Sequence, residues 1–267
     1  MLPHYSPYKV AELFSMLSGL NPGRIDLGVG RAPGSDQITA WALQRDRNHP
    51  APDDFPQQLA EMLAYLEGGV PDDHPFHRIA ALPGSPERPA TWLLGSSGQS
   101  GVWAAQYSLP YAFADFIGGD GTRIAKYYRA NFQPTPGRLD APYTMVAVRA
   151  ICAETDEEAL RRGASTQLQL ILRERGRQLG GVIPMEEALK QLELEGIPLG
   201  ALPRGRKVLV GSPKTIREQI EQVAADYEAE EVMLLTITHD HRHRRESYRL
   251  IAEEFGLSTP TVATLDM

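Results

Sequence analysis

This sequence contains one cysteine and no long apolar run, and each of these observations excludes some classes of protein. Cys152 is the single cysteine, which excludes an intrachain disulfide and a multi-cysteine metal site and suits a reducing cytoplasm. No uninterrupted apolar run approaches the ~18 residues of a membrane span. Residues 1–5 lack the basic and apolar regions of a signal peptide. We therefore expect a cytoplasmic protein with no membrane partner.

Positive charge is also in short supply. The 27 Lys and Arg residues against 34 Asp and Glu residues leave a net charge of −7. Nucleic acids and anionic membranes bind basic surfaces, so the sequence predicts neither as a partner. The 24 Gly and 21 Pro residues follow no period, which is typical of tight loops between regular elements.

Extended and helical apolar patterns alternate along the chain. Strands are expected at residues 24–31, 91–94, 111–116, 143–152 and 232–238. Helices are expected at residues 7–20, 38–45, 55–66, from 99 onward, 122–132, 156–174, 185–195, 213–227 and 244–255. This alternation predicts a parallel sheet with helical crossovers. Five strands fit either an open doubly wound sheet or an eight-stranded barrel whose first strands lie outside the chain.

A glycine- and serine-rich loop between an expected strand and an expected helix is the sharpest local signal. It contains Gly95, Ser96, Ser97, Gly98 and Ser100. Such a loop directs backbone N–H groups, hydroxyls and the positive end of a helix dipole to one point, which favours an anion such as a phosphate. The competing interpretation is an ordinary helix cap with flexible serines.

Arg31 follows a strand with one bulky and one nearly empty face. Leu27 and Val29 share the bulky face, whereas Gly28 and Gly30 share the other. Ligands of parallel α/β folds bind at the carboxyl ends of the strands, so Arg31 is placed to give two charge-assisted bonds to a phosphate. The alternative is a solvated loop arginine.

Two other motifs are weaker evidence for a binding site than the loop and Arg31. A dinucleotide-binding glycine motif would need its third glycine at Pro33, and Asp53, at the distance of its ribose carboxylate, lies in a proline-rich loop. Alternating histidines at His239, His241 and His243 are able to bind a metal, but neighbouring arginines would repel it. We therefore assign no metal site and interpret the histidines as a solvated turn.

Four blocks of the sequence resemble a known family. They are residues 3–12, 20–36, 92–97 and 210–213, in that order. Together they are similar to the bacterial-luciferase-like, flavin-dependent monooxygenases. The resemblance implies a (β/α)₈ TIM barrel of the luciferase-like type as one domain over residues 1–267. It also implies an insertion at about residues 176–207, before the last helix and strand pair.

The same resemblance implies that the chain lacks strands one and two of that barrel and most of strand three. Either Met1 is an internal methionine of a longer protein, or another chain covers the open sheet edge, as in a homodimer. The implied cofactor is reduced FMN from a partner reductase, and its phosphate would lie against Arg31, Gly95, Ser96, Ser97, Gly98 and Ser100. His4 is the one candidate catalytic residue.

The implied activity is a monooxygenase that uses FMNH2 and O2 to oxidise a small organic substrate through a flavin C4a-peroxide. Two alternatives stay open. One is a catalytically inactive flavin-binding or oligomerising barrel fragment. The other is an oxidoreductase that uses the deazaflavin F420, whose phosphate would suit the same anion site.

Overall fold

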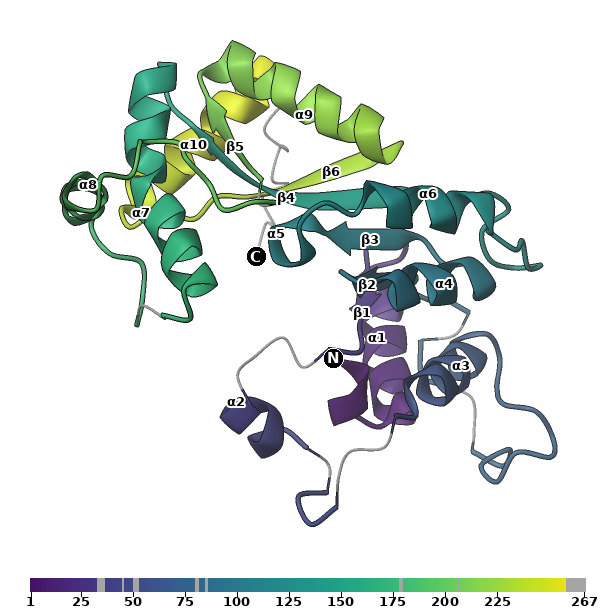
Figure 1. Ribbon diagram of the computed structural model, residues 1–267. Coiled ribbons are helices and arrows are strands. Elements are labelled where there is room, and N and C mark those ends of the chain that lie inside the picture. Colours follow the sequence, from purple (N-terminus) through teal and green to yellow (C-terminus); the bar gives the residue numbers. More distant parts are fainter. Residues whose placement is uncertain are drawn as a thin grey trace, which may run out of the picture. The chain divides into compact units, whose positions relative to one another are not determined.

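The computed structural model describes residues 1–32, 37–44, 46–49, 53–79, 82–84, 86–177, 180–205 and 207–257, in which helices alternate with strands (Figure 1). The chain divides into two compact units. The first comprises Met1–Ala112 and Lys126–Tyr143, and the second comprises Phe113–Ala125 and Thr144–Met267. Within the part of the chain that the structure describes, no helix combines the length and apolar character needed to cross a membrane.

The first unit carries two parallel strands and the helices packed on them. Its elements are η1 (Leu2–His4), α1 (Pro7–Leu20), β1 (Asp26–Val29), α2 (Gln37–Ala42), α3 (Phe55–Leu66), β2 (Ala90–Gly95) and α4 (Gly98–Gln106). Strand β1 pairs in parallel with β2, from Asp26 opposite Ala90 to Val29 opposite Leu93. Helix α1 packs against α3, and α4 packs against β2.

The second unit is built around a long buried strand. Its elements are α5 (Asp115–Gly118), β4 (Thr144–Cys152), α7 (Asp156–Glu174), α8 (Met185–Leu194), β5 (Val208–Gly211), α9 (Pro213–Tyr227), β6 (Glu231–Leu235) and α10 (His241–Glu254). Strand β4 pairs in parallel with β5 and with β6. Strand β3 (Tyr111–Ala114) and helix α6 (Thr122–Ala130) contribute residues to both units.

The expected α/β alternation is confirmed, and several helix bounds agree closely with the prediction. Helices α1, α7 and α9 have the predicted ends. Each of them begins directly after a serine or threonine in an extended conformation, as at Thr155, whose hydroxyl accepts a hydrogen bond from the Glu158 N–H. A side-chain cap is present at α7, while α1 and α9 begin with a proline, whose backbone angle suits the first turn of a helix.

Three predicted elements need correction. The count of five strands is wrong, because Val208–Gly211 forms a sixth strand beside the last four residues of β4. The strand expected over 111–116 ends at Ala114, and α5 begins at Asp115. The last helix begins at His241 instead of Arg244.

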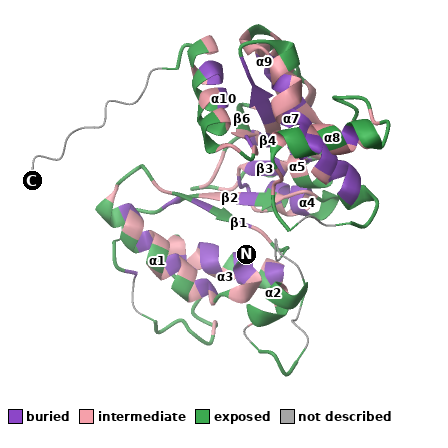
Figure 2. Ribbon diagram, turned by 90° about the vertical axis from the view of Figure 1, so that its left-hand side faces the viewer, coloured by how far each residue is buried: buried purple, intermediate pink, exposed green. Residues whose placement is uncertain are grey.

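Helix α1 buries its small residues instead of its large ones (Figure 2). Ser15 is buried, and its hydroxyl donates a 2.6 Å hydrogen bond to the Pro83 carbonyl. Leu13 and Leu20, two of the apolar residues that recur at helical spacing in this segment, are 50% and 78% exposed. Small side chains allow the backbone of a neighbouring segment to come close, and that contact decides which face of the helix is buried.

Candidate functional site

The loop between β2 and α4 is held from inside by one buried serine. The Ser100 hydroxyl donates to the Ser97 carbonyl at 2.7 Å and lies 2.9 Å from the Tyr111 hydroxyl. It also accepts the Ser97 N–H at 3.4 Å, which is one arm of a capping box. A Cβ at Gly95 would overlap Ser100, so the loop requires glycine there. Ser100 thus supports the turn.

The other side of the same loop is open. Ser97 and Gly98 are exposed and Ser96 is partly exposed. A Cβ at Gly98 would meet no atom within 4 Å. Gly98 begins α4, and the first N–H groups of a helix have no acceptor inside it. The capping box takes up the N–H groups of Ser97 and Ser100, so the N–H groups of Gly98 and Gln99, at the positive end of the helix dipole, are the backbone donors that would meet an anion.

Arg31 lies beside the helix that this loop opens. Its guanidinium carbon is 5.5 Å from the ring centroid of Trp103, a residue of α4. The Trp103 ring in turn contacts the ring of Phe55 at 5.0 Å, and Phe55 is fully buried. The structure thus associates the two anion-site candidates that the sequence suggested separately, Arg31 and the β2–α4 loop, with one helix.

Asp53 is the acidic partner of Arg31. Its Oδ1 atom is 3.6 Å from Arg31 Nη1, and the two side chains are 78% and 49% exposed. A pair so exposed contributes only about 0–1 kcal/mol. Nothing in the sequence pairs Trp103 or Asp53 with the Arg31 side chain, because both residues lie far from Arg31 in the chain.

The small face of β1 is present as predicted. Leu27 and Val29 are buried, whereas Asp26 and Gly28 are exposed. A Cβ at Gly28 would come within 2.9 Å of the Leu94 side chain, so β2 occupies the space that this glycine leaves. Pro33 and Gly34, which bear on the dinucleotide interpretation, lie outside the described residues.

His4 ends the short helix η1, which lies at the carboxyl end of β1. The Leu2 N–H donates to the Gly30 carbonyl at 3.2 Å, and the Tyr5 N–H closes the turn on Leu2. His4 therefore belongs to the same unit as Arg31, near the same strand end. The backbone N–H of His4 donates to the Met1 carbonyl at 3.1 Å.

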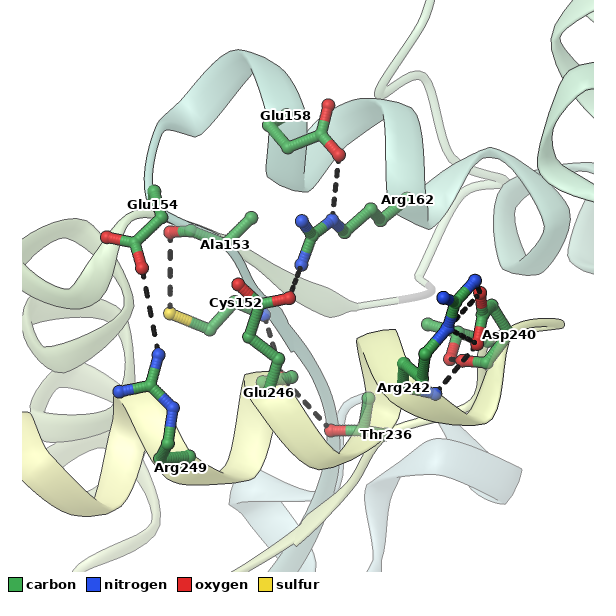
Figure 3. Close-up of polar contacts among 12 residues, drawn as sticks. Cys152, Ala153, Glu154, Glu158, Arg162, Thr236, Asp240, Arg242, Glu246 and Arg249 are labelled. Carbon is green, nitrogen blue, oxygen red and sulfur yellow. Dashed lines mark hydrogen bonds and ion pairs between the residues drawn. The ribbon is translucent and has the colours of Figure 1, made fainter.

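The histidine cluster of the second unit has a different structure from the one expected. His241 and His243 belong to helix α10 instead of a turn. Asp240 caps this helix and binds the Arg242 side chain, with a shortest distance of 2.7 Å (Figure 3). The Arg242 guanidinium holds the pKa of the Asp240 carboxyl well below its usual range. Over the described ranges, no three His, Cys, Asp or Glu residues gather as a metal site would need.

Cys152 lies buried at the end of β4, beside the polar contacts that join α7 to α10. Arg162 bridges Glu158 of α7 and Glu246 of α10 at 2.8 Å each (Figure 3). The Cys152 N–H donates to the Ser247 hydroxyl at 2.9 Å. Burial, and to a lesser degree the nearby Glu154 carboxylate, raises the pKa of the Cys152 thiol to about 11.

We expect the Cys152 thiol to be unreactive in the folded protein between pH 7 and about 9, because thiolate is the reactive form and little is present below its pKa. An Ellman's-reagent assay should show no fast reaction in buffer and one thiol per chain in guanidinium chloride. Fast stoichiometric labelling of the folded chain would contradict this, and Cys152→Ala is the control for background reaction.

The fold is that of an α/β protein in which the parallel strand β2 leads into a glycine- and serine-rich loop at the start of α4. The chain belongs to the luciferase-like monooxygenase family, whose model matches residues 1–228. This finding confirms the predicted resemblance.

Several relatives share most of the chain. YwcH of Bacillus subtilis is 41% identical over 258 residues, which are 96% of this chain and 77% of that protein. The N-acetyl-S-alkylcysteine monooxygenase of the same organism is 30% identical over 95% of this chain and 75% of its own. The crystal structure of apo-MsnO8 has 36% identity and a TM-score of 0.82, and the match covers 97% of this chain and 76% of that one.

More distant solved structures share the fold. The oxygenating component of 3,6-diketocamphane monooxygenase from Pseudomonas putida, solved with FMN, has a TM-score of 0.59 at 20% identity, covering 95% of this chain and 76% of that one. An F420-dependent secondary alcohol dehydrogenase has a TM-score of 0.57 at 11% identity, covering 96% of this chain and 76% of its own. At such identities the likeness establishes the luciferase-like α/β fold.

Proposed function

We propose that this protein is a flavin-dependent monooxygenase that uses reduced FMN and O2 to oxidise a small organic substrate. Membership of the luciferase-like monooxygenase family and the 30% identical N-acetyl-S-alkylcysteine monooxygenase support an oxygenase. The FMN in a distant structural neighbour supports the choice of cofactor. The observation that carries the proposal is the stacking of Arg31 on Trp103, a residue of the helix that the open loop begins.

The residues present fit a phosphate. Arg31 supplies a permanent positive charge whose flat face lies on Trp103, so that its N–H edge, which faces the exposed Asp53 carboxylate, is directed away from the ring and is able to bind oxygens. Ser96, Ser97 and the Gly98 N–H supply further donors from the exposed side of the loop. Gly95 and Ser100 keep the loop in this shape from within. These are the residues that would hold the FMN phosphate.

The chemistry itself belongs largely to the cofactor. When bound, reduced flavin supplies two electrons, with which one oxygen atom of O2 enters the substrate and the other leaves as water. The protein contributes binding, orientation and the exclusion of water. His4 remains our candidate catalytic residue because it lies near the same strand end as Arg31.

The wider organisation is part of the same proposal. It comprises a single barrel-type domain over residues 1–267 with an insertion at about residues 176–207. A partner reductase would supply the reduced FMN. A homodimer would cover an open sheet edge.

We expect Arg31→Ala to weaken FMN binding about 10- to 100-fold, because charge-assisted hydrogen bonds contribute about 1.5–3 kcal/mol. Quenching of flavin fluorescence on titration with the protein measures this affinity. Riboflavin lacks the phosphate, so its affinity should not change. Arg24→Ala, which removes an exposed arginine of the same unit, is the matched control.

The outcomes of this titration separate the alternatives. Equal FMN affinity in the parent chain and in Arg31→Ala would overturn the phosphate assignment. FMN binding without substrate-dependent O2 consumption, when a flavin reductase is supplied, would favour the inactive flavin-binding fragment. Tighter binding of F420 than of FMN would favour a deazaflavin-dependent oxidoreductase, the class of one structural neighbour.

A further inference from the structure

Arg31 has two contacts of opposite character. The Trp103 ring lies 5.5 Å from the guanidinium carbon, and the Asp53 carboxylate lies 3.6 Å from Nη1. The first contact uses the flat face of the guanidinium, and the second uses its N–H edge. An anion bound by Arg31 would need the same edge, so Asp53 and that anion compete for it.

The geometry points to Asp53 as an internal competitor for the phosphate site, with Trp103 as the positioning residue that keeps the Arg31 guanidinium in place. This inference rests on the proposed function, because it assumes that Arg31 binds the cofactor phosphate. Asp53 would lower the affinity of the site for anions, and Trp103 would raise it.

The contact between Asp53 and Arg31 is suited to exchange. A strong arginine–carboxylate pair has N···O distances of about 2.7–2.9 Å, often at two nitrogens, whereas this pair has 3.6 Å between its atoms. Both side chains are largely exposed, so water and salt screen their attraction. A phosphate carries more charge and more acceptor oxygens than one carboxylate, and it also meets the donors of the β2–α4 loop. It would therefore displace Asp53.

Trp103 is fixed where Asp53 is not. Its ring contacts the fully buried Phe55, the first residue of α3. The Tyr107 hydroxyl, directly after α4, donates a 3.1 Å hydrogen bond to the carbonyl of the next α3 residue, Pro56. The Trp103 ring is thus held by packing between two helices, whereas the Asp53 carboxylate is 78% exposed. A rigid ring below the guanidinium keeps it in position while the carboxylate leaves.

We expect Asp53→Asn to tighten FMN binding about two- to fivefold, the fold-change that corresponds to a weak exposed ion pair. Riboflavin binding should not change, and Asp53→Asn should give no gain when Arg31 is already alanine. Asp72→Asn removes the same charge from an exposed loop of the same unit and is the matched control.

Trp103→Leu should weaken FMN binding two- to fivefold, because it removes the ring that supports the Arg31 guanidinium. Trp103→Phe should retain most of the parent affinity, because it keeps an aromatic ring at that place.

A second measurement needs no cofactor. The Arg31 Nε–H resonance, assigned by its loss in Arg31→Ala, should shift in Asp53→Asn and should not shift in Asp72→Asn. An unshifted resonance, or an FMN affinity equal to that of Asp72→Asn, would overturn the role of Asp53 while the phosphate assignment stands. If FMN binding is unaffected by Arg31→Ala, the phosphate assignment and the role of Asp53 are both overturned. If the parent chain shows no saturable FMN binding, the proposed function is overturned as well.

Discussion

We expect Tyr227→Phe to lower the free energy of unfolding by about 2–4 kcal/mol, because it removes one oxygen that two buried groups use. The Tyr227 hydroxyl donates to Asp115 Oδ2 at 2.7 Å and accepts the Gly121 N–H at 2.7 Å. Tyr227 is fully buried and Asp115 is 1% exposed. A phenylalanine would fill the space of the ring and leave the carboxylate and the N–H without this partner.

Urea unfolding followed by circular dichroism measures this loss, with the slope of the transition checked for each variant. Tyr127→Phe is the matched control, because Tyr127 is 47% exposed and should lose little. A midpoint for Tyr227→Phe within the error of that of Tyr127→Phe would show that the hydroxyl contributes no net stability.

The contribution of the Tyr227 hydroxyl to stability should depend on pH only under alkaline conditions. Burial, together with the Asp115 carboxylate, raises the pKa of Tyr227 far above its ordinary value of about 10. Because the folded state favours the protonated phenol, this contribution to stability is complete below about pH 10 and is lost as the pH rises above that value. Stability near neutral pH should therefore not depend on Tyr227 ionisation.

The second large effect is expected in the β2–α4 loop. Gly95→Ala should destabilise the protein by about 1–3 kcal/mol, because the new methyl group would overlap the Oγ and Cβ atoms of Ser100. Ser100 is 6% exposed and is held by Ser97 and Tyr111, so it has little room to move. The thermal midpoint and the FMN affinity should fall together.

Gly98→Ala is the matched control for this substitution. It adds the same methyl group three residues later, where no atom lies within 4 Å. Gly98 is helical, so alanine should leave stability unchanged or raise it by up to about 1 kcal/mol. Equal effects of the two substitutions would contradict the assignment of Ser100 as the support of the loop.

Several features of this protein were readable from neighbouring residues alone. The ends of α1, α7 and α9, the glycine face of β1 and the open glycine–serine loop all follow from caps, periodicity and turn chemistry. Arg31 was identified as a candidate by its place after a strand. Each of these signals acts over a few neighbouring residues, so it can be recognised without the tertiary structure.

Other features depended on segments far apart in the sequence. The strand at Val208–Gly211 pairs with the end of β4, a segment far from it in the sequence. The exposure of Leu13 and the burial of Ser15 reflect the close approach of the segment at Pro83. Helical periodicity gives the apolar positions of a helix, but the neighbouring backbone decides which face it covers.

The sequence by itself predicted the α/β class and the ends of α1, α7 and α9, because caps, turns and apolar periods are local, and it suggested Arg31 and the β2–α4 loop as candidate anion donors. Only the tertiary structure associated Arg31 with α4 through Trp103, and only it brought Asp53 to the same guanidinium. Those contacts join residues about twenty to seventy positions apart, and at that separation packing and charge decide which side chains meet.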